Sequence, residues 1–171
     1  MRSETEAIRE LPRAFADCRG WKEKFKRSRR LVPSGHPEAT TEKYDSHALL
    51  MCHEKAGDFA ELLLAAGWPD EVVPNVVEPA AFSFRGVAAK FTGFLHREKD
   101  DAGRLHGKAV DKQGRLMYFE HGQLHREDGP AVIHPDGERE FFRSNERVET
   151  AKPGQEPETP DRNVAEAPTR A

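Results

Sequence analysis

The sequence predicts an α+β protein, in which an N-terminal helical segment precedes an antiparallel sheet of stacked β-hairpin repeats and a disordered C-terminal tail. Three observations support this class. Apolar residues recur at three- and four-residue spacings in the first third of the chain, which is typical of amphipathic helices. Further on, glycines separate short segments rich in Val, Ile, Phe and Tyr, in an order that recurs about every 22 residues. The last residues are acidic and rich in proline.

Residues 1–31 predict a basic amphipathic helix or a kinked pair of helices. Ser3 and Glu6 have the spacing of a capping box, which satisfies backbone N–H groups at a helix start. Pro12 predicts either a kink or a second helix that begins near this proline. The apolar stripe consists of Ile8, Leu11, Phe15, Cys18, Trp21 (or Lys22) and Phe25.

Residues 41–74 predict a helical cap on the repeats. The main helix is expected to begin near Thr41 or Asp45 and to stop at Gly67, because glycine favours the left-handed conformation that ends helices. A further helical turn is expected to end at Pro74. The predicted buried face consists of Leu49, Cys52, Ala56, Phe59, Ala60 and Leu63.

Two segments are expected to lack packed structure. Residues 32–40 contain the run Val-Pro-Ser-Gly-His-Pro and predict a linker. Residues 149–171 predict a disordered acidic tail, because they cannot bury enough apolar surface to offset the entropy of ordering.

Residues 75–148 predict three β-hairpin repeats, of which the first, from Pro79 to His96, is the most diverged. One glycine turns the chain within each unit, at Gly86, Gly114 and Gly137. A second residue turns it into the next hairpin, at Gly93, Gly122 and Asn145, since asparagine tolerates positive φ. His96, His106 and His125 are expected to occupy the same place in successive repeats and to bond to neighbouring turns. The predicted structural residues are Leu95, His96, Leu105, His106, Gly114, Leu124, His125, Gly129 and Gly137.

The most complete copy of the motif is Leu124-His125-Arg126-Glu127-Asp128-Gly129-Pro130-Ala131-Val132, with Asp136-Gly137 and Phe141-Phe142 downstream. This pattern resembles the MORN and MORN-variant β-hairpin repeats, and most closely the "LHREDGPA" repeats of bacterial and phage proteins, over residues 79–148. The resemblance implies a sheet that serves as an interaction surface. It also implies an inhibitor or antitoxin-like partner of a nuclease or defence complex, located in the cytoplasm of a bacterium or of a phage-infected host cell.

The histidines and carboxylates of the repeats could be metal ligands or acid–base pairs, but their pattern favours structure. The sequence contains no HExxH motif, zinc-ligand spacing, Gly-rich phosphate loop or nucleophile elbow. A catalytic site is normally built once, whereas these histidines recur. We therefore predict no catalytic residue, no metal and no cofactor. Cys18 and Cys52 are expected to be buried thiols in a reducing compartment, and no segment predicts a membrane span or a signal peptide.

The sequence therefore predicts a non-enzymatic protein-interaction module. On the repeats, the expected contacts are Tyr118, Arg126, Phe142 and Arg143. On the N-terminal helix they are Trp21, Lys22, Lys24, Lys26, Arg27, Arg29 and Arg30.

Three alternatives stay open. The basic segment from Arg19 to Arg30 could bind nucleic acid, or Trp21 and Phe25 could pack inward beneath a solvated basic face. A metal-dependent hydrolase that uses the repeat histidines is the least favoured. Because no cap follows Val148, self-association or a partner chain is expected to cover that end of the array.

Overall fold

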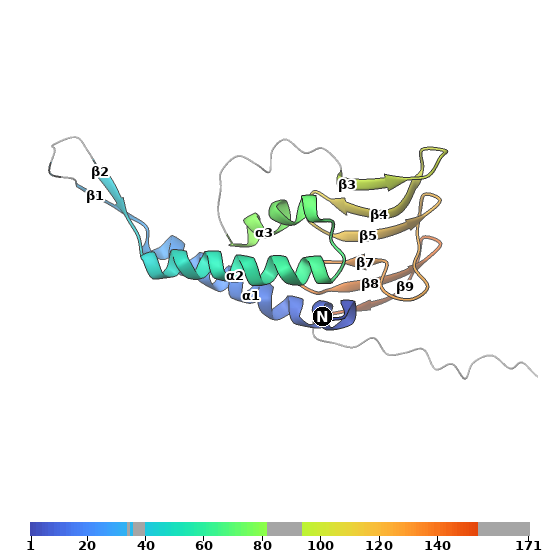
Figure 1. Ribbon diagram of the computed structural model, residues 1–171, viewed down its shortest axis with the longest axis horizontal. Coiled ribbons are helices and arrows are strands. Elements are labelled where there is room, and N and C mark those ends of the chain that lie inside the picture. Colours follow the sequence, from blue (N-terminus) through green and yellow to red (C-terminus); the bar gives the residue numbers. More distant parts are fainter. Residues whose placement is uncertain (34, 36–39, 82–93, 154–171) are drawn as a thin grey trace, which may run out of the picture.

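The computed structural model describes residues 1–33, 35, 40–81 and 94–153. In these residues, helices make up most of the N-terminal half and antiparallel strands most of the C-terminal half (Figure 1). This arrangement confirms the α+β class. The residues expected to form the tail beyond 153 lie outside the described ones. Among the described helices, none combines the length and apolarity needed to cross a membrane.

The first helix, α1 (Glu4–Ser28), is one continuous helix and not a pair. The predicted capping box is present: the Ser3 hydroxyl accepts the Glu6 N–H at 3.3 Å, and the Glu6 carboxylate accepts the Ser3 N–H at 2.9 Å. Pro12 lies inside the helix without dividing it. Ala7, Ile8, Leu11, Ala14 and Cys18 are buried, and Phe15, Trp21 and Phe25 of the predicted stripe are half-buried.

The predicted linker, residues 32–40, is wrong at its two ends, where residues 32–33 and 40 belong to strands, and residues 34 and 36–39 lie outside the described ones. Strands β1 (Arg30–Pro33) and β2 (Thr40–Lys43) pair antiparallel, from Arg30 opposite Lys43 to Pro33 opposite Thr40. Four-residue strands are too short for a clear alternation of apolar and polar residues, so the Pro and Gly residues between them dominated the pattern.

The second helix, α2 (Ser46–Ala65), begins at the Asp45 cap, not at Thr41. The Asp45 carboxylate accepts the N–H groups of His47 and Ala48. At the other end Gly67 has φ +104°, and the N–H groups of Gly67 and Trp68 donate to the carbonyls of Leu64 and Leu63. These are the two bonds of a Schellman motif, which confirms the predicted stop at Gly67.

Pro74 does not end the helical region. A short 3-10 turn, η1 (Asp70–Val72), leads into α3 (Val73–Ala81). Pro74 lies in the first turn of α3, where its missing N–H would have no helical partner. Pro79 to Ala81, expected to open the first repeat, are therefore helical. Residues 82–93 of that repeat, including Gly86 and Gly93, lie outside the described residues, and its last residues, from Phe94 to His96, are in a strand.

The main sheet is an antiparallel meander in the order β3-β4-β5-β7-β8-β9, with the two-residue strand β6 paired to β5. It extends to Ala151, three residues beyond the predicted end at Val148, so the start of the predicted tail is a strand. The strands are β3 (Phe94–Lys99), β4 (Leu105–Asp111), β5 (Leu116–Glu120), β6 (Gln123–Leu124), β7 (Val132–Ile133), β8 (Arg139–Arg143) and β9 (Glu146–Ala151).

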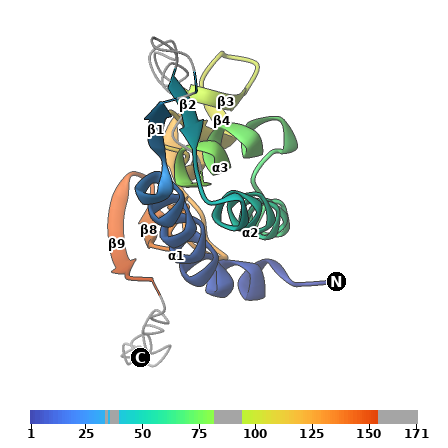
Figure 2. The ribbon, with the colours of Figure 1, turned by 90° about the vertical axis from the view of Figure 1, so that its left-hand side faces the viewer.

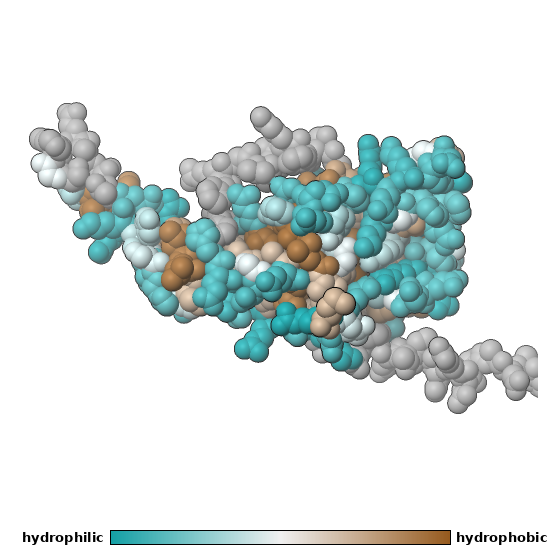
Figure 3. Space-filling view, viewed as in Figure 1, coloured by the Kyte–Doolittle hydropathy of each residue, from teal (hydrophilic) through white to brown (hydrophobic). Residues whose placement is uncertain are grey.

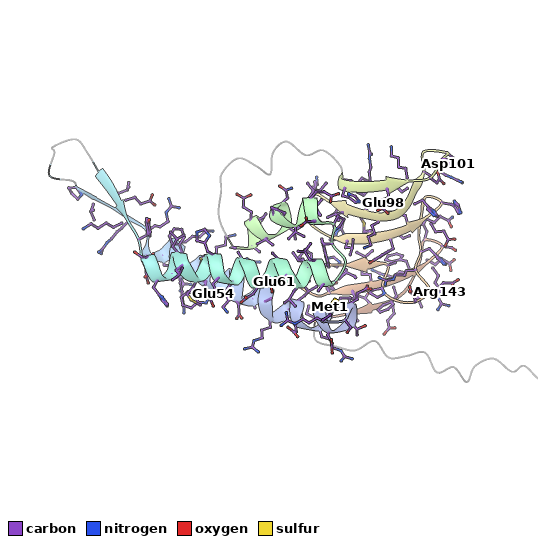
Figure 4. The ribbon with its side chains drawn as sticks, viewed as in Figure 1. Met1, Glu54, Glu61, Glu98, Asp101 and Arg143 are labelled. Atoms are coloured by element: carbon purple, nitrogen blue, oxygen red, sulfur yellow. The ribbon has the colours of Figure 1, made fainter. Side chains whose placement is uncertain are left out.

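The turns of this sheet alternate between two ends. Residues 111–115 and 134–138 turn at the end next to the helices, and residues 100–104, 121–122 and 144–145 turn at the far end, where Figure 4 shows Asp101 and Arg143. Gly122 and Asn145 have φ +85° and +67°. Their predicted role in reversing the chain is confirmed, because such tight hairpin turns need positive φ.

The helices pack against one side of the sheet (Figures 1 and 2) and share one apolar core with its inner face. From the sheet, Val110, Leu116 and Ile133 join this core. Trp68 is buried at the junction, where its indole N–H donates to the Gly114 carbonyl at 2.8 Å.

Candidate interaction surfaces

Two histidines of the repeats each hold a far-end turn that lies further along the chain, His106 the turn at residues 121–122 and His125 the turn at residues 144–145. The Nδ1 of His106 accepts the His121 N–H at 3.2 Å, and the preceding carbonyl, of Leu105, accepts the Gly122 N–H at 2.7 Å. In the next unit His125 and Leu124 bond in the same way to the N–H groups of Ser144 and Asn145, at 3.0 and 2.9 Å. The Leu-His pair is therefore a turn-anchoring device in both units.

His96 does not share this place, although the tetrapeptide Leu-His-Arg-Glu around it is the same. Its Nδ1 lies 2.6 Å from a carboxylate oxygen of Glu71, in η1. Leu95 and His96 lie well inside β3, whereas Leu105 begins β4 and Leu124 ends β6. The expectation that all three histidines are equivalent is wrong, because identical residues occupy different strand positions.

The far-end loop before β4 has a half-buried carboxylate of its own. Asp100 accepts the N–H groups of Ala102 and Arg104 and lies 3.3 Å from His121. Burial tends to raise the pKa of this carboxyl, but the hydrogen bonds from Arg104 and His121 and the Arg104 charge bring the pKa down to about 2. The Asp100 carboxylate therefore stabilises this turn.

Two of the four contacts predicted on the repeats are internal. The Arg126 guanidinium lies 4.1 Å from the Tyr118 ring centroid and bonds to Glu4 at 2.9 Å and to Asp128 at 3.0 Å. Burial raises the pKa of Tyr118. Gly129 does not have positive φ; it lies against the Arg126 side chain instead. These residues join α1 to the sheet and are not free to bind a partner.

The other two lie toward the far end of the sheet. Phe142 is half-buried and Arg143 is exposed, so this part of the predicted contact surface is small.

The last strand, β9, forms an edge of the sheet, and no described strand pairs with its outer side. Its residues Glu146 and Arg147 are exposed. Charged edge residues disfavour strand addition, so self-association through this edge stays a prediction.

The basic segment belongs to a structure that we call the arm, made of residues 19–33 and 40–50. The arm comprises the end of α1, the β1–β2 ribbon and the start of α2, and the ribbon projects away from the sheet (Figure 1). Contacts between aromatic rings join the end of α1 to residues 44 and 47. Trp21 meets the His47 ring edge-on at 5.6 Å, and Phe25 meets the Tyr44 ring at 5.5 Å. The inward packing of Trp21 and Phe25, kept open as an alternative, is therefore partly realised.

The six basic residues of the arm that were predicted as contacts fall into two groups. Four are engaged within the chain: Lys22 donates to the Pro79 carbonyl, Lys24 lies 4.2 Å from the Trp21 ring centroid, Lys26 lies 3.7 Å from Glu23, and Arg29 bonds to Glu42. Arg27 and Arg30 are exposed and have no carboxylate partner among the described residues.

Three large apolar side chains are exposed on the same arm. The exposed fraction is 71% for Leu31, 46% for Tyr44 and 62% for Leu50. Figure 3 shows apolar surface near the start of α2 beside hydrophilic surface. None of the three was predicted as a contact, because Leu31 and Tyr44 lie outside the helical stripe and Leu50 lies next to the predicted buried Leu49. For Leu50, the signal available in the sequence was its position off the predicted buried face of the helix, which indicates an exposed side chain.

The α1–α2 pair also forms an open groove of about 570 Å³. Its charged side chains have both signs and come from both helices and, in the case of Arg2, from the residues before α1. They are Arg2, Glu10, Arg13, Asp17, Lys55, Asp58 and Glu61, with Ala14 and Leu62.

Cys18 is fully buried and donates to the Lys55 carbonyl, and burial raises the pKa of its thiol to about 12. This thiol is therefore held in its inert, protonated form.

Comparison with known proteins adds no relative to this description. No protein family, curated protein sequence or solved structure matches the chain. Among the described residues, the arm carries three of the six large apolar side chains that are exposed, together with the unpaired Arg27 and Arg30.

Proposed function

We propose that this protein is a non-enzymatic binding module, whose arm contacts an acidic protein with an apolar recess. The observation that carries the proposal is the exposure of Leu31, Tyr44 and Leu50 on one projecting structure. Large apolar side chains exposed among polar ones on one part of the surface are a feature of protein-interaction sites. Arginine and aromatic residues are also enriched in such sites.

The charge of the arm supports an acidic partner. Between residues 19 and 30 the sequence has seven basic residues and a single acidic one, Glu23. Within the arm, Arg27 and Arg30 carry charges that no described carboxylate neutralises. An acidic partner would pair with these two arginines and would be steered toward the arm at low ionic strength.

The same geometry favours protein over nucleic acid. Leu31 and Leu50 are aliphatic and can neither pair with phosphate nor stack on a base. Trp21 and Phe25 meet other rings edge-on and are half-buried, so their faces are not free platforms for stacking. Arg29 is already bonded to Glu42. We keep nucleic-acid binding as the alternative, and the experiment below separates the two.

The test compares four forms of the full-length chain as immobilised bait: the wild type, two arm variants and a control. The apolar variant is Leu31→Ser, Tyr44→Ser, Leu50→Ser, and the charge variant is Arg27→Glu, Arg30→Glu. The matched control is Leu64→Ser, Val148→Ser, which removes exposed apolar side chains outside the arm. We expect one protein to be retained by the wild type and the control and lost by both arm variants, with circular dichroism showing all forms folded.

Nucleic acid is tested on the same variants by titrating labelled double-stranded DNA and single-stranded RNA at two salt concentrations. If the chain binds these probes with a steep salt dependence, and the charge variant loses binding while the apolar variant keeps it, the nucleic-acid alternative replaces our proposal. Retention of the protein partner by the apolar variant would also overturn it.

The repeat sheet is, in this proposal, the scaffold that holds the helices and thereby the arm. The resemblance of residues 124–132 to the "LHREDGPA" repeats narrows the proposed partner to a nuclease or defence complex in a bacterial cytoplasm. That narrower proposal rests on the resemblance alone, and identification of the retained protein by mass spectrometry tests it.

A further inference from the structure

Hairpin β7–β8 brings three potential metal ligands together on the outer face of the sheet: His134, Glu138 and Glu140. His134 and Glu138 lie opposite each other at the turn, where the His134 N–H donates to the Glu138 carbonyl at 2.8 Å. Glu140 is two residues further along β8, opposite Val132, and so lies on the same face. One ligand atom from each residue lies within 4.8 Å of the others, and Nε2 of His134 is 2.9 Å from Oε1 of Glu140.

The preceding hairpin, β4–β5, shows that the fold does not need this trio. Its turn has the same backbone bonds 23 residues earlier, from Asp111 N–H to Arg115 carbonyl and from Gly114 N–H to Asp111 carbonyl. The residues at the three equivalent positions are Asp111, Arg115 and Met117. Asp111 and Arg115 form an ion pair at 2.6 Å, and Met117 is buried.

Turn capping does not explain His134 either. In the preceding hairpin the Asp111 carboxylate accepts the N–H groups of Gln113 and Arg115. In β7–β8 it is the Asp136 carboxylate that caps the turn, because it accepts the Glu138 N–H at 3.0 Å. The trio is therefore a feature that one hairpin has and its neighbour lacks, in contrast to the turn-anchoring His106 and His125.

We propose that His134, Glu138 and Glu140 bind one divalent transition-metal ion of the zinc class. One imidazole nitrogen with two carboxylates suits Zn²⁺ or Co²⁺ better than Mg²⁺ or Ca²⁺, which prefer oxygen ligands alone. The side chains of His134 and Glu140 are 22% and 17% exposed, so water can complete the coordination. Ligand atoms that each lie about 2 Å from one ion are about 3–4 Å from each other. Small rotations of the three side chains would bring their ligand atoms from the observed spacing to these distances.

The charges around the trio are compatible with a cation. The neighbouring strand β5 begins next to Arg115, the basic group of the adjoining turn, and Asp111 already engages that guanidinium. The turn itself adds the Asp136 carboxylate. The sequence led us to predict no metal, because His96, His106 and His125 recur in the repeats; His134 is not one of these three histidines.

The ion would stabilise the junction between sheet and helices. The turn at residues 134–138 contains Gly137, which packs directly on Pro12 of α1. Coordination would fix β7 to β8 at this contact, so Zn²⁺ should raise the melting temperature of the full-length chain, because an ion that binds only the folded state shifts the unfolding equilibrium.

The test uses the full-length, tag-free chain, stripped with chelator and titrated with Zn²⁺ by calorimetry and with Co²⁺ by absorption spectroscopy. We expect one ion per chain, a Co²⁺ spectrum with nitrogen–oxygen ligation, and no competition from Mg²⁺. Glu138→Gln and Glu140→Gln should each weaken Zn²⁺ binding at least about tenfold. The control His53→Gln, Glu54→Gln changes an exposed histidine and carboxylate on α2 and should leave the affinity unchanged.

A triple variant, His134→Asp, Glu138→Arg, Glu140→Met, gives this hairpin the residues of the preceding one. It should fold, as judged by circular dichroism, without binding the ion. Absence of Zn²⁺ binding by the wild type, or binding that survives in the folded triple variant, would overturn the proposal. So would binding that is lost instead on His121→Gln, since His121 and His106 form a second pair of rings at 4.7 Å.

Discussion

At the scale of single residues, two glycines decide how closely the sheet approaches the helices. Gly114 and Gly137 both have positive φ, at +82° and +90°, and both lie in turns next to the helices. A Cβ at Gly114 would lie 3.0 Å from a Val76 methyl carbon, and one at Gly137 would lie 2.6 Å from the Pro12 ring. Glycine is required at these positions by backbone conformation and by space together.

We expect Gly137→Ala to destabilise the fold by roughly 2 kcal/mol or more, because it adds both left-handed strain and a clash with Pro12. Gly57→Ala is the matched control. Gly57 lies inside α2 with no atom near an added Cβ, so this change should stabilise the protein by about 0.5–1 kcal/mol. Urea denaturation measures both free energies of unfolding, and equal effects of the two substitutions would contradict the argument.

At the scale of elements, the N-terminus of α1 is joined to the sheet through Arg126. This guanidinium bonds to Glu4 in the first turn of the helix and stacks over Tyr118 of β5. Only 14% of its side chain is exposed. The planar guanidinium donates hydrogen bonds to a carboxylate and stacks on an aromatic ring at the same time. A lysine ammonium cannot make both contacts with this geometry.

Arg126→Met should therefore lower the free energy of unfolding by about 1–3 kcal/mol, and Arg126→Lys should recover only part of the loss. The control is Arg143→Met, at an exposed far-end position, which should change stability by less than about 0.5 kcal/mol. Thermal or urea denaturation of the three variants provides the comparison. Indistinguishable stabilities of Arg126→Met and Arg143→Met would show that the junction contributes nothing.

The elements that local chemistry determines were predictable from the sequence. The capping box at Ser3, the stop at Gly67 and the reversals at Gly122 and Asn145 each depend on a few adjacent residues. Helix α3 was missed because Pro74 was treated as a stop, although a proline in the first helical turn breaks no bond.

The candidate sites were less predictable, because they depend on contacts between distant residues. Arg126 and Glu4 are 122 positions apart, so the sequence pattern could not show that Arg126 faces inward. His96 and His125 share a tetrapeptide but differ in strand position, which only the register of the sheet reveals. The basic segment was found from composition, whereas the exposure of Leu31 depends on the unexpected β1–β2 ribbon.

At the scale of the whole molecule, helices and repeats are one folding unit. The core is continuous from α1, α2 and α3 to Val110, Leu116 and Ile133 of the sheet. Neither half buries its apolar face without the other. This differs from a repeat array whose units are stabilised mainly by their immediate neighbours.

We therefore expect a single cooperative unfolding transition. In a Trp21→Phe background, the fluorescence of the buried Trp68 should report the helix–sheet junction, and far-UV circular dichroism should follow the whole chain with the same midpoint. Residues 94–153 expressed alone should lack the folded spectrum. Two separate transitions, or a folded isolated sheet, would refute this dependence.

The alternating turns of the sheet also limit how this chain can grow. Each helix-side turn has its own helix: residues 111–115 meet α3 at Val76, and residues 134–138 meet α1 at Pro12. A hairpin duplicated after β9 would bring one more such turn, with no described helix beside it (Figure 1). Lengthening by gene duplication would thus require a new helix with every hairpin, whereas loops inserted at residues 121–122 or 144–145 would extend into solvent without disturbing the core.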